Sequence, residues 1–138
     1  MKTKTANEPY AADVQQLARQ NSDFRRVLNT TERSQLVLMC VPAGGEIGQE
    51  IHAGTDQILA FVEGNGEAIF ADERRPVAAG DVVVVPAGTQ HNFVAGTGAA
   101  LKLFTIYTPP HHRPGTVHAT KADADADTSD QYPSSSPK

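Results

Sequence analysis

Residues 44–66 read GGEIGQEIHAGTDQILAFVEGNG, and this stretch contains a carboxylate, an imidazole and an amide at strand and turn spacing. Glu50 and His52 are two residues apart, so on a strand both side chains point to the same face. The small residues at 53–55 predict a turn, after which the chain returns as an apolar strand that begins at Gln57. We therefore predict a β-hairpin in which Gln57 can reach the face that carries Glu50 and His52.

A second segment, residues 80–91, reads GDVVVVPAGTQH and contributes another histidine. Its valine run predicts a strand, and Pro86-Ala87-Gly88 predicts a tight turn just before His91. A carboxylate, two imidazoles and an amide oxygen are ligands that one divalent metal ion accepts. The four predicted metal ligands are Glu50, His52, Gln57 and His91.

The rest of the chain predicts short strands around one core. Val14, Leu17 and Ala18 lie at helical spacing and predict one short helix over residues 11–19. Asn and Gly tolerate the positive φ that hairpin turns need, so residues 63–66 (EGNG) predict a hairpin turn. Apolar or alternating runs predict strands at residues 24–28, 35–41, 67–70, 82–85, 92–95 and 100–107. This pattern is typical of an all-β antiparallel sandwich or small barrel.

Composition limits the class of protein. A chain of 138 residues suits one domain, and its net charge of −4 without a basic stripe argues against nucleic acid as a partner. The apolar runs are too short to cross a membrane. Cys40 is the single cysteine, and no apolar region follows the N-terminal lysines, so we predict a cytoplasmic protein.

We divide the chain into three parts. Residues 1–22 form an arm with the short helix, and residues 23–118 form the β domain. Residues 119–138 alternate Ala with Asp and end in a Ser- and Pro-rich segment, which predicts a disordered tail.

The two segments described first resemble the two signature motifs of the cupin superfamily. Its first motif runs glycine, five residues, His-x-His, four residues, Glu, six residues, glycine. Its second runs glycine, five residues, Pro-x-Gly, two residues, His, three residues, Asn. The matching positions here are Gly44, Glu50-Ile51-His52, Gln57 and Gly64, then Gly80, Pro86-Ala87-Gly88, His91 and Ala95. The resemblance covers about residues 34–107 and implies a double-stranded β-helix, or jelly-roll barrel, with a metal site.

The chain departs from this family pattern at two ligand positions. Glu50 replaces the first histidine and Gln57 replaces the glutamate, so the site keeps one carboxylate at the other end of the motif. Two histidines and one carboxylate resemble the facial set of non-haem iron sites, and Fe, Mn, Zn and Ni all remain open. Asp56 is the rival of Gln57, but Leu59 and Phe61 share the face of Gln57, which favours Gln57 as the inward residue.

The segment at 105–122, TIYTPPHHRPGTVHATKA, looks like that of small bacterial cupins labelled mannose-6-phosphate-isomerase-like. His111 and His112 are read either as solvated loop residues or as a lid over the pocket, and Tyr107 either lines the pocket or lies in a dimer contact. Three functions stay open: a metal-dependent isomerase, epimerase or lyase acting on a small polar metabolite, an Fe(II) oxygenase, and a non-catalytic small-ligand sensor. We also predict a homodimer, because pairing would cover sheet edges and apolar outer faces.

Overall fold

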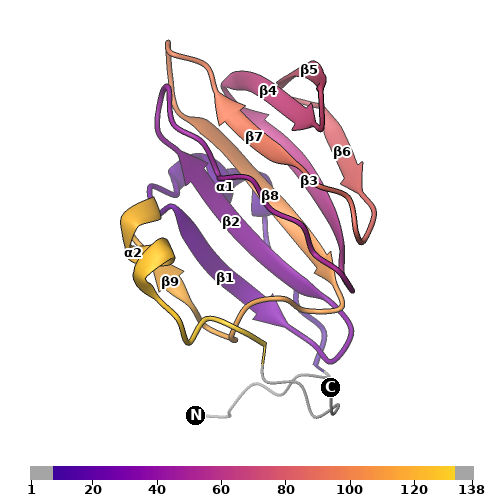
Figure 1. Ribbon diagram of the computed structural model, residues 1–138. Helices are drawn as coiled ribbons and strands as arrows, with labels where there is room; N and C mark the ends of the chain where they lie inside the picture. The colour runs from indigo at the N-terminus through magenta and orange to yellow at the C-terminus, as the bar shows by residue number, and fades with distance from the viewer. Residues whose placement is uncertain (1–7, 133–138) are drawn as a thin grey trace.

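The fold consists of two facing antiparallel sheets (Figure 1), seen in a computed structural model that describes residues 8–132. The larger sheet has the order β6 (Val82–Val85), β3 (Asp56–Glu63), β8 (Leu101–Thr108), β2 (Gln35–Val41), β1 (Arg25–Thr30) and β9 (Val117–His118). The smaller sheet has the order β5 (Glu73–Ala78), β4 (Asn65–Phe70) and β7 (Asn92–Ala95). The predicted all-β class is confirmed, although neither sheet closes on itself within the described residues.

Strand periodicity builds the core between the sheets. Along β8 the residues alternate strictly, so Leu101, Leu103 and Tyr107 are buried whereas Phe104 and Ile106 lie on the outer face. Phe93 of the smaller sheet packs against Phe61 of β3, with ring centroids 5.7 Å apart. These residues belong to one apolar core between the two sheets.

The short N-terminal helix α1 (Val14–Gln20) is confirmed. Asp13 caps it, because its side chain accepts a hydrogen bond from the Gln16 amide at 3.1 Å. Helix α1 contacts β8, β2 and β3 of the larger sheet, and the Lys102 ammonium donates to the Arg19 carbonyl at 2.7 Å. The helix therefore covers part of the outer face of that sheet.

The predicted hairpin around Glu50 is wrong in its pairing. Residues 45–52 form no regular strand, and only isolated bridges join Glu46 to Val94 and Glu50 to His91. Gly48 interrupts the ladder with φ +113, and its amide donates to the Asn92 side chain at 2.9 Å instead of to a backbone carbonyl. This segment thus runs beside β7, not beside β3.

The turn at residues 63–66 is also not a hairpin, since β3 and β4 belong to different sheets. Gly64 has φ +88, and a Cβ there would collide with the carbonyl oxygen of Ala100. A Cβ at Gly66 would collide with the carbonyl oxygen of Val94. The two glycines allow the chain to cross from one sheet to the other where the backbones approach closely.

The C-terminal segment differs from its predicted disorder. Residues 121–126 form helix α2 (Lys121–Ala126), capped by the Thr120 side chain, which accepts from the Asp123 amide at 3.1 Å. Asp127 and Asp130 then contact buried histidines of the β domain. Residues 133–138 of the predicted tail, and residues 1–7 of the predicted arm, lie outside the described residues. The three-part division of the chain stays a prediction.

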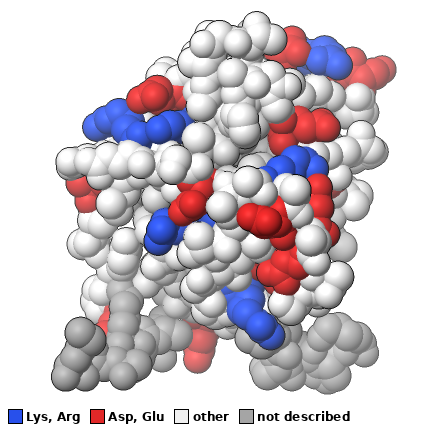
Figure 2. All heavy atoms as spheres, turned by 90° about the vertical axis from the view of Figure 1, so that its left-hand side faces the viewer, with Lys and Arg blue, Asp and Glu red and all other residues white. Residues whose placement is uncertain are grey.

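No helix among residues 8–132 is long and apolar enough to cross a membrane. On the face shown in Figure 2, Lys and Arg side chains are interspersed with Asp and Glu side chains, and the coloured residues gather into no broad basic area.

Candidate metal site

The two sequence motifs meet through their backbones. The Glu50 amide donates to the His91 carbonyl at 2.8 Å, and the His91 amide donates back to the Glu50 carbonyl at 2.9 Å. The Gly88 amide donates to the His52 carbonyl at 2.7 Å, in the turn that Pro86 begins. Gly88 has φ +84, which glycine adopts without strain. These bonds bring residues about 40 apart in sequence into one site.

Glu50, His52 and His91 form a compact ligand cluster. The distance from His52 Nε2 to Glu50 Oε1 is 3.3 Å, and that from His91 Nε2 to the same oxygen is 3.9 Å. One ligand atom from each residue lies within 4.8 Å of the other two. Both histidines are buried, at 7% and 2% exposure, so the carboxylate faces two nitrogens in a region with little water.

His91 is held in the tautomer that a metal ligand needs. Its Nδ1 lies 2.9 Å from the Thr89 carbonyl oxygen, which can only accept, so Nδ1 carries the proton and Nε2 keeps its lone pair. Burial lowers the pKa of His91, which favours the neutral imidazole. His91 Nε2 is therefore available to a cation.

Glu50 supplies the negative charge of the cluster. Burial alone would raise the pKa of its carboxyl, but the neighbouring His52 and the charge of Arg25 hold the pKa below its ordinary value. The Glu50 side chain is also 30% exposed, more than either histidine, so it lies where the cluster opens to solvent.

Gln57, not Asp56, points inward. Gln57 is 2% exposed, whereas Asp56 is exposed and accepts from the Ala87 amide at 2.8 Å. The Gln57 amide nitrogen donates to Thr105 Oγ1 at 3.1 Å and to the Tyr107 hydroxyl at 3.2 Å. Tyr107 in turn lies 5.9 Å from His52 between ring centroids. Gln57 is therefore linked to the three-residue cluster through Tyr107, and its role as a ligand stays a prediction.

Buried atoms without partners show that these residues fit a metal ion. Among residues 8–132, four buried side-chain atoms lack a hydrogen-bond partner. Three of the four are His52 Nε2, His91 Nε2 and Gln57 Oε1, and the fourth is Arg25 Nε. Leaving such groups unpaired costs about 1–3 kcal/mol each, so a cation that accepts their lone pairs would remove a real penalty.

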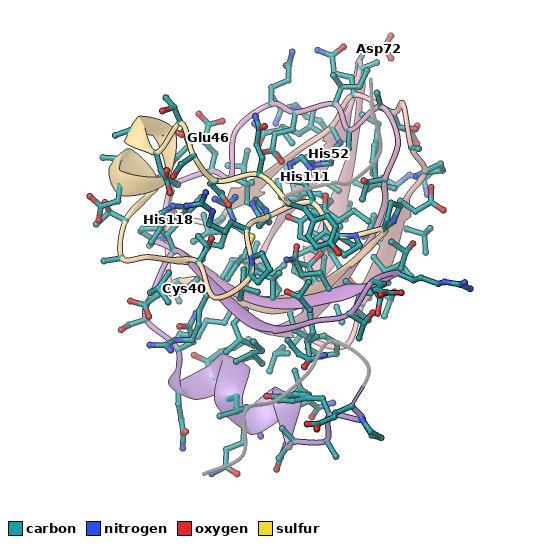
Figure 3. All side chains as sticks on the ribbon, turned by 90° about the horizontal axis from the view of Figure 1, so that it is seen from below. Cys40, Glu46, His52, Asp72, His111 and His118 are labelled. Atoms are coloured by element: carbon teal, nitrogen blue, oxygen red, sulfur yellow. The ribbon has the colours of Figure 1, made fainter. Side chains whose placement is uncertain are left out.

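His111 belongs to the site, as Figure 3 shows by its place beside His52. The two ring centroids are 4.3 Å apart, and the Tyr107 ring stacks on His111 at 5.5 Å. Burial, with the nearby charges of His112 and His52, lowers the pKa of His111 to about 4, so its imidazole is neutral near pH 7. Both rings lie against His52 inside the fold, and the roles of His111 as a lid and of Tyr107 as a pocket-lining residue stay predictions.

His112 points the other way, into a buried network that the sequence did not indicate. Its Nδ1 lies 2.8 Å from Asp130 Oδ2, and its Nε2 lies 3.3 Å from the Tyr107 hydroxyl. Asp130 Oδ2 also lies 3.9 Å from an Arg25 nitrogen. Neither Arg25 nor Asp130 stands in a motif, and no spacing pattern could have singled them out.

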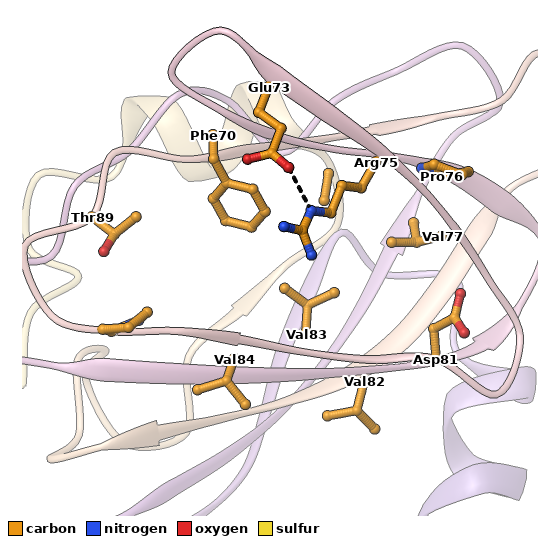
Figure 4. Close-up of a pocket in the computed structure, with 12 residues that line it drawn as sticks. Phe70, Glu73, Arg75, Pro76, Val77, Asp81, Val82, Val83, Val84 and Thr89 are labelled. Carbon is orange, nitrogen blue, oxygen red and sulfur yellow. Dashed lines mark hydrogen bonds and ion pairs between the residues drawn. The ribbon is translucent and has the colours of Figure 1, made fainter.

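Concave regions lie beside the cluster and away from it. A cavity of about 120 Å³ adjoins His91 and is lined by Gln49, Ile69, Ala71, Gln90, His91 and Asn92. A larger cavity of about 510 Å³ opens between β5 and β6, where Figure 4 shows Arg75 paired with Glu73 above Val83. None of the four predicted ligands lines the larger cavity.

Comparisons with known proteins agree with this geometry. The cupin domain family matches residues 37–107. The chain is 39% identical to the uncharacterized protein YrkC of Bacillus subtilis over 85% of its own length and 66% of that protein. It is 34% identical to an uncharacterized protein of Acanthamoeba polyphaga mimivirus over 80% of its length and 72% of that protein.

The crystal structure of BH2720 from Bacillus halodurans is similar throughout, with a TM-score of 0.86, 36% identity, and coverage of 88% of this chain and 96% of that one. The chain spans about two thirds of the curated relatives' length. Because the family match, the sheet topology and the paired motifs agree, this chain belongs to the cupin domain family.

Proposed function

We propose that this cupin binds one divalent metal ion through Glu50, His52, His91 and Gln57 and acts on a small, polar, oxygen-rich metabolite as an isomerase, epimerase or lyase. The observation that carries the proposal is the set of buried, unpartnered atoms His52 Nε2, His91 Nε2 and Gln57 Oε1 beside the Glu50 carboxylate. An ion held there would act as a Lewis acid on an oxygen of the bound metabolite.

Residues around the metal site would supply negative charge and exclude water. Glu50 keeps its charge, because His52 holds the carboxyl pKa low, and it balances part of the charge of a cation. His111 and Tyr107 form an aromatic wall against His52 and exclude water from that side. With less water nearby, electrostatic interactions between the site and a polar ligand are stronger.

The pairing of two histidines with one carboxylate favours a second candidate, an Fe(II)-dependent oxygenase. A non-catalytic ligand-binding cupin would use the same cluster without turnover. The isomerase-type assignment also draws on the resemblance of residues 105–122 to the mannose-6-phosphate-isomerase-like group. The small-molecule ligand and the cytoplasmic location remain predictions.

The test is elemental analysis of protein purified without an affinity tag that carries metals. We expect close to one equivalent of metal in the wild type and loss of that metal in His52→Ala and in His91→Ala. His118→Ala is the matched control, because His118 is also buried but pairs with Asp127. Metal retained in both ligand variants would remove the proposal.

Turnover assays on the metal-loaded protein separate the candidate functions. Oxygen consumption that depends on Fe(II) would identify the oxygenase. Isomerisation or elimination of hydroxy-acid or sugar substrates without oxygen would support the first candidate. Tight ligand binding with no turnover under either condition would favour the non-catalytic small-ligand sensor.

A further inference from the structure

A line of buried hydrogen bonds joins the C-terminal segment to Gln57. Asp130 Oδ2 lies 2.8 Å from His112 Nδ1, and His112 Nε2 lies 3.3 Å from the Tyr107 hydroxyl. The Tyr107 hydroxyl accepts from the Gln57 amide nitrogen at 3.2 Å. All four side chains are buried, so water does not compete at these positions.

The chemistry of the groups decides the direction of each bond. An ionised carboxylate can only accept, so His112 Nδ1 donates to Asp130 and carries the proton of the neutral ring. His112 Nε2 is then an acceptor, and the Tyr107 hydroxyl must donate to it. The Tyr107 oxygen keeps lone pairs that accept from an N–H of Gln57. The amide nitrogen of Gln57 is thereby directed at Tyr107, and the amide oxygen is the end left without a partner.

A second contact supports the same orientation of the amide. Thr105 Oγ1 donates to the Ile58 carbonyl at 2.9 Å, and this fixes its hydrogen. Thr105 Oγ1 therefore presents lone pairs to Gln57, whose nitrogen donates to it at 3.1 Å. A flipped Gln57 would place its oxygen against the Thr105 and Tyr107 oxygens and lose both bonds.

Asp130 is itself held rigidly. Its Oδ1 accepts from the Arg113 amide at 3.2 Å, and its Oδ2 lies 3.9 Å from an Arg25 nitrogen. Its side chain is 8% exposed. The carboxylate thus occupies a fixed place between the C-terminal segment and the β domain.

We propose that Asp130 and His112 are positioning residues that act through Tyr107 to orient the Gln57 amide, so that its oxygen is presented as the neutral ligand of the metal ion. This inference rests on the proposed function, because a bound metal ion is what the unpartnered Gln57 amide oxygen would coordinate. Groups that orient metal ligands typically change affinity by about 10- to 100-fold when they are removed.

The first experiment uses metal-free protein and reads the ring nitrogens of His112 by ¹⁵N NMR. We expect the proton on Nδ1 in the wild type and in Asp130→Asn, which keeps an oxygen acceptor. Asp130→Ala should lose this preference. Asp127→Ala is the control, since Asp127 lies on the same segment but pairs with His118. A wild-type His112 with its proton on Nε2 would overturn the inference.

The second experiment measures Co(II) affinity in a double-mutant cycle. Asp130→Ala and Tyr107→Phe should each weaken binding about tenfold, and the double variant should show little further loss, because both changes break the same line. Asp130→Asn and Asp127→Ala should bind nearly as the wild type does. Additive losses, or equal losses in Asp127→Ala and Asp130→Ala, would indicate a merely structural role and refute the inference.

The two experiments keep the proposals apart. A wild type that binds no Co(II) but carries the His112 proton on Nδ1 refutes the metal function and leaves only the order of the hydrogen bonds standing. A wild type that binds Co(II) with the proton on Nε2 refutes the positioning role alone. Tyr107→Phe keeps the aromatic packing, so it tests the line even where Asp130→Ala fails to fold.

Discussion

Backbone groups hold the predicted metal ligands of this protein in place. Thr89 supplies the carbonyl that fixes the tautomer of His91, and the carbonyl of His52 receives the Gly88 amide. Both contacts come from the turn between β6 and β7. A change in that turn would therefore disturb two metal-ligand candidates at once, although the turn itself contributes only His91 to the cluster.

The predicted ligands should differ in their contribution to metal affinity. Gln57→Ala removes a neutral amide oxygen and should weaken binding about tenfold, whereas Glu50→Ala removes the carboxylate and should weaken it further. Titration with Zn(II), followed by calorimetry, measures both. His118→Ala is the control, since His118 is buried but pairs with Asp127 instead of with the cluster. The opposite order of losses would reverse the ligand assignment.

Two glycines offer a clean test of the close backbone approach between the sheets. Gly66→Ala places a Cβ against the Val94 carbonyl oxygen and should lower the free energy of unfolding by about 1–3 kcal/mol. Gly98→Ala meets no atom within 4 Å and should change it by less than about 0.5 kcal/mol. Neither glycine has a positive φ, so the difference between their chemical denaturation midpoints reports sterics alone. Equal midpoints would contradict the described approach.

The sequence predicted residues that depend on local spacing and missed those that depend on distant pairing. Strand alternation was enough to choose Gln57 over Asp56, and the burial of the two residues confirms that choice. Asp130 has no such local signal, because its partners Arg25 and His112 lie 105 and 18 positions away. The polar, low-complexity composition of residues 119–138 gave no indication that the Asp130 carboxylate would be buried in the folded protein.

At the scale of elements, the C-terminal segment is the part whose behaviour differs most from its composition. Few apolar side chains hold this segment against the β domain, and helix α2 contains no buried residue. Its order comes instead from Asp127 and Asp130, which pair with His118, His112 and Arg25. The segments at residues 45–52 and 63–66 were misjudged for a related reason, since turn propensity does not reveal which sheet a strand joins.

Truncation after residue 119 should therefore destabilise the protein. It removes the carboxylate that pairs with Arg25 and His112, and breaking a buried pair costs about 3 kcal/mol. Thermal unfolding should show a clear drop in Tm. Asp125→Ala is the control, because Asp125 forms only an exposed pair with Lys121 and should leave Tm nearly unchanged. An unchanged Tm after truncation would instead agree with the predicted disordered tail.

Acid should weaken the same contact. Burial alone would raise the pKa of Asp130, but the hydrogen bonds from His112 and the Arg113 amide, with the charge of Arg25, hold the pKa below its ordinary value. A lowered pKa in the folded state means that the carboxylate stabilises the protein fully above about pH 4 and loses this contribution as the pH falls through the folded pKa. The Tm difference between wild type and Asp130→Asn should thus be large at pH 7 and shrink toward pH 2. A difference that stays constant with pH would show that the charge of Asp130 is not involved.

On the scale of the whole molecule, the outer face of the larger sheet carries exposed apolar side chains at its β6 edge. Val82 and Val84 of edge strand β6 are 61% and 59% exposed. The strand register continues from them into two apolar rows across the sheet, Val84–Ile58–Ile106–Leu36 and Val82–Ala60–Phe104–Leu38. Helix α1 packs mainly on β8, β2 and β3.

This face supports the proposed homodimer and identifies where it should be tested. Val84→Lys puts a charge into an apolar row at a sheet edge, where lysine opposes association, and should convert a dimer into a monomer at micromolar concentration without loss of fold. Val117→Lys is the matched control, because Val117 is an exposed valine on β9 at the opposite edge of the same sheet. Native mass spectrometry and light scattering measure the oligomeric state, and circular dichroism checks the fold. A wild type that is monomeric at this concentration would refute the dimer, and a Val84→Lys variant that remains dimeric would place the interface elsewhere.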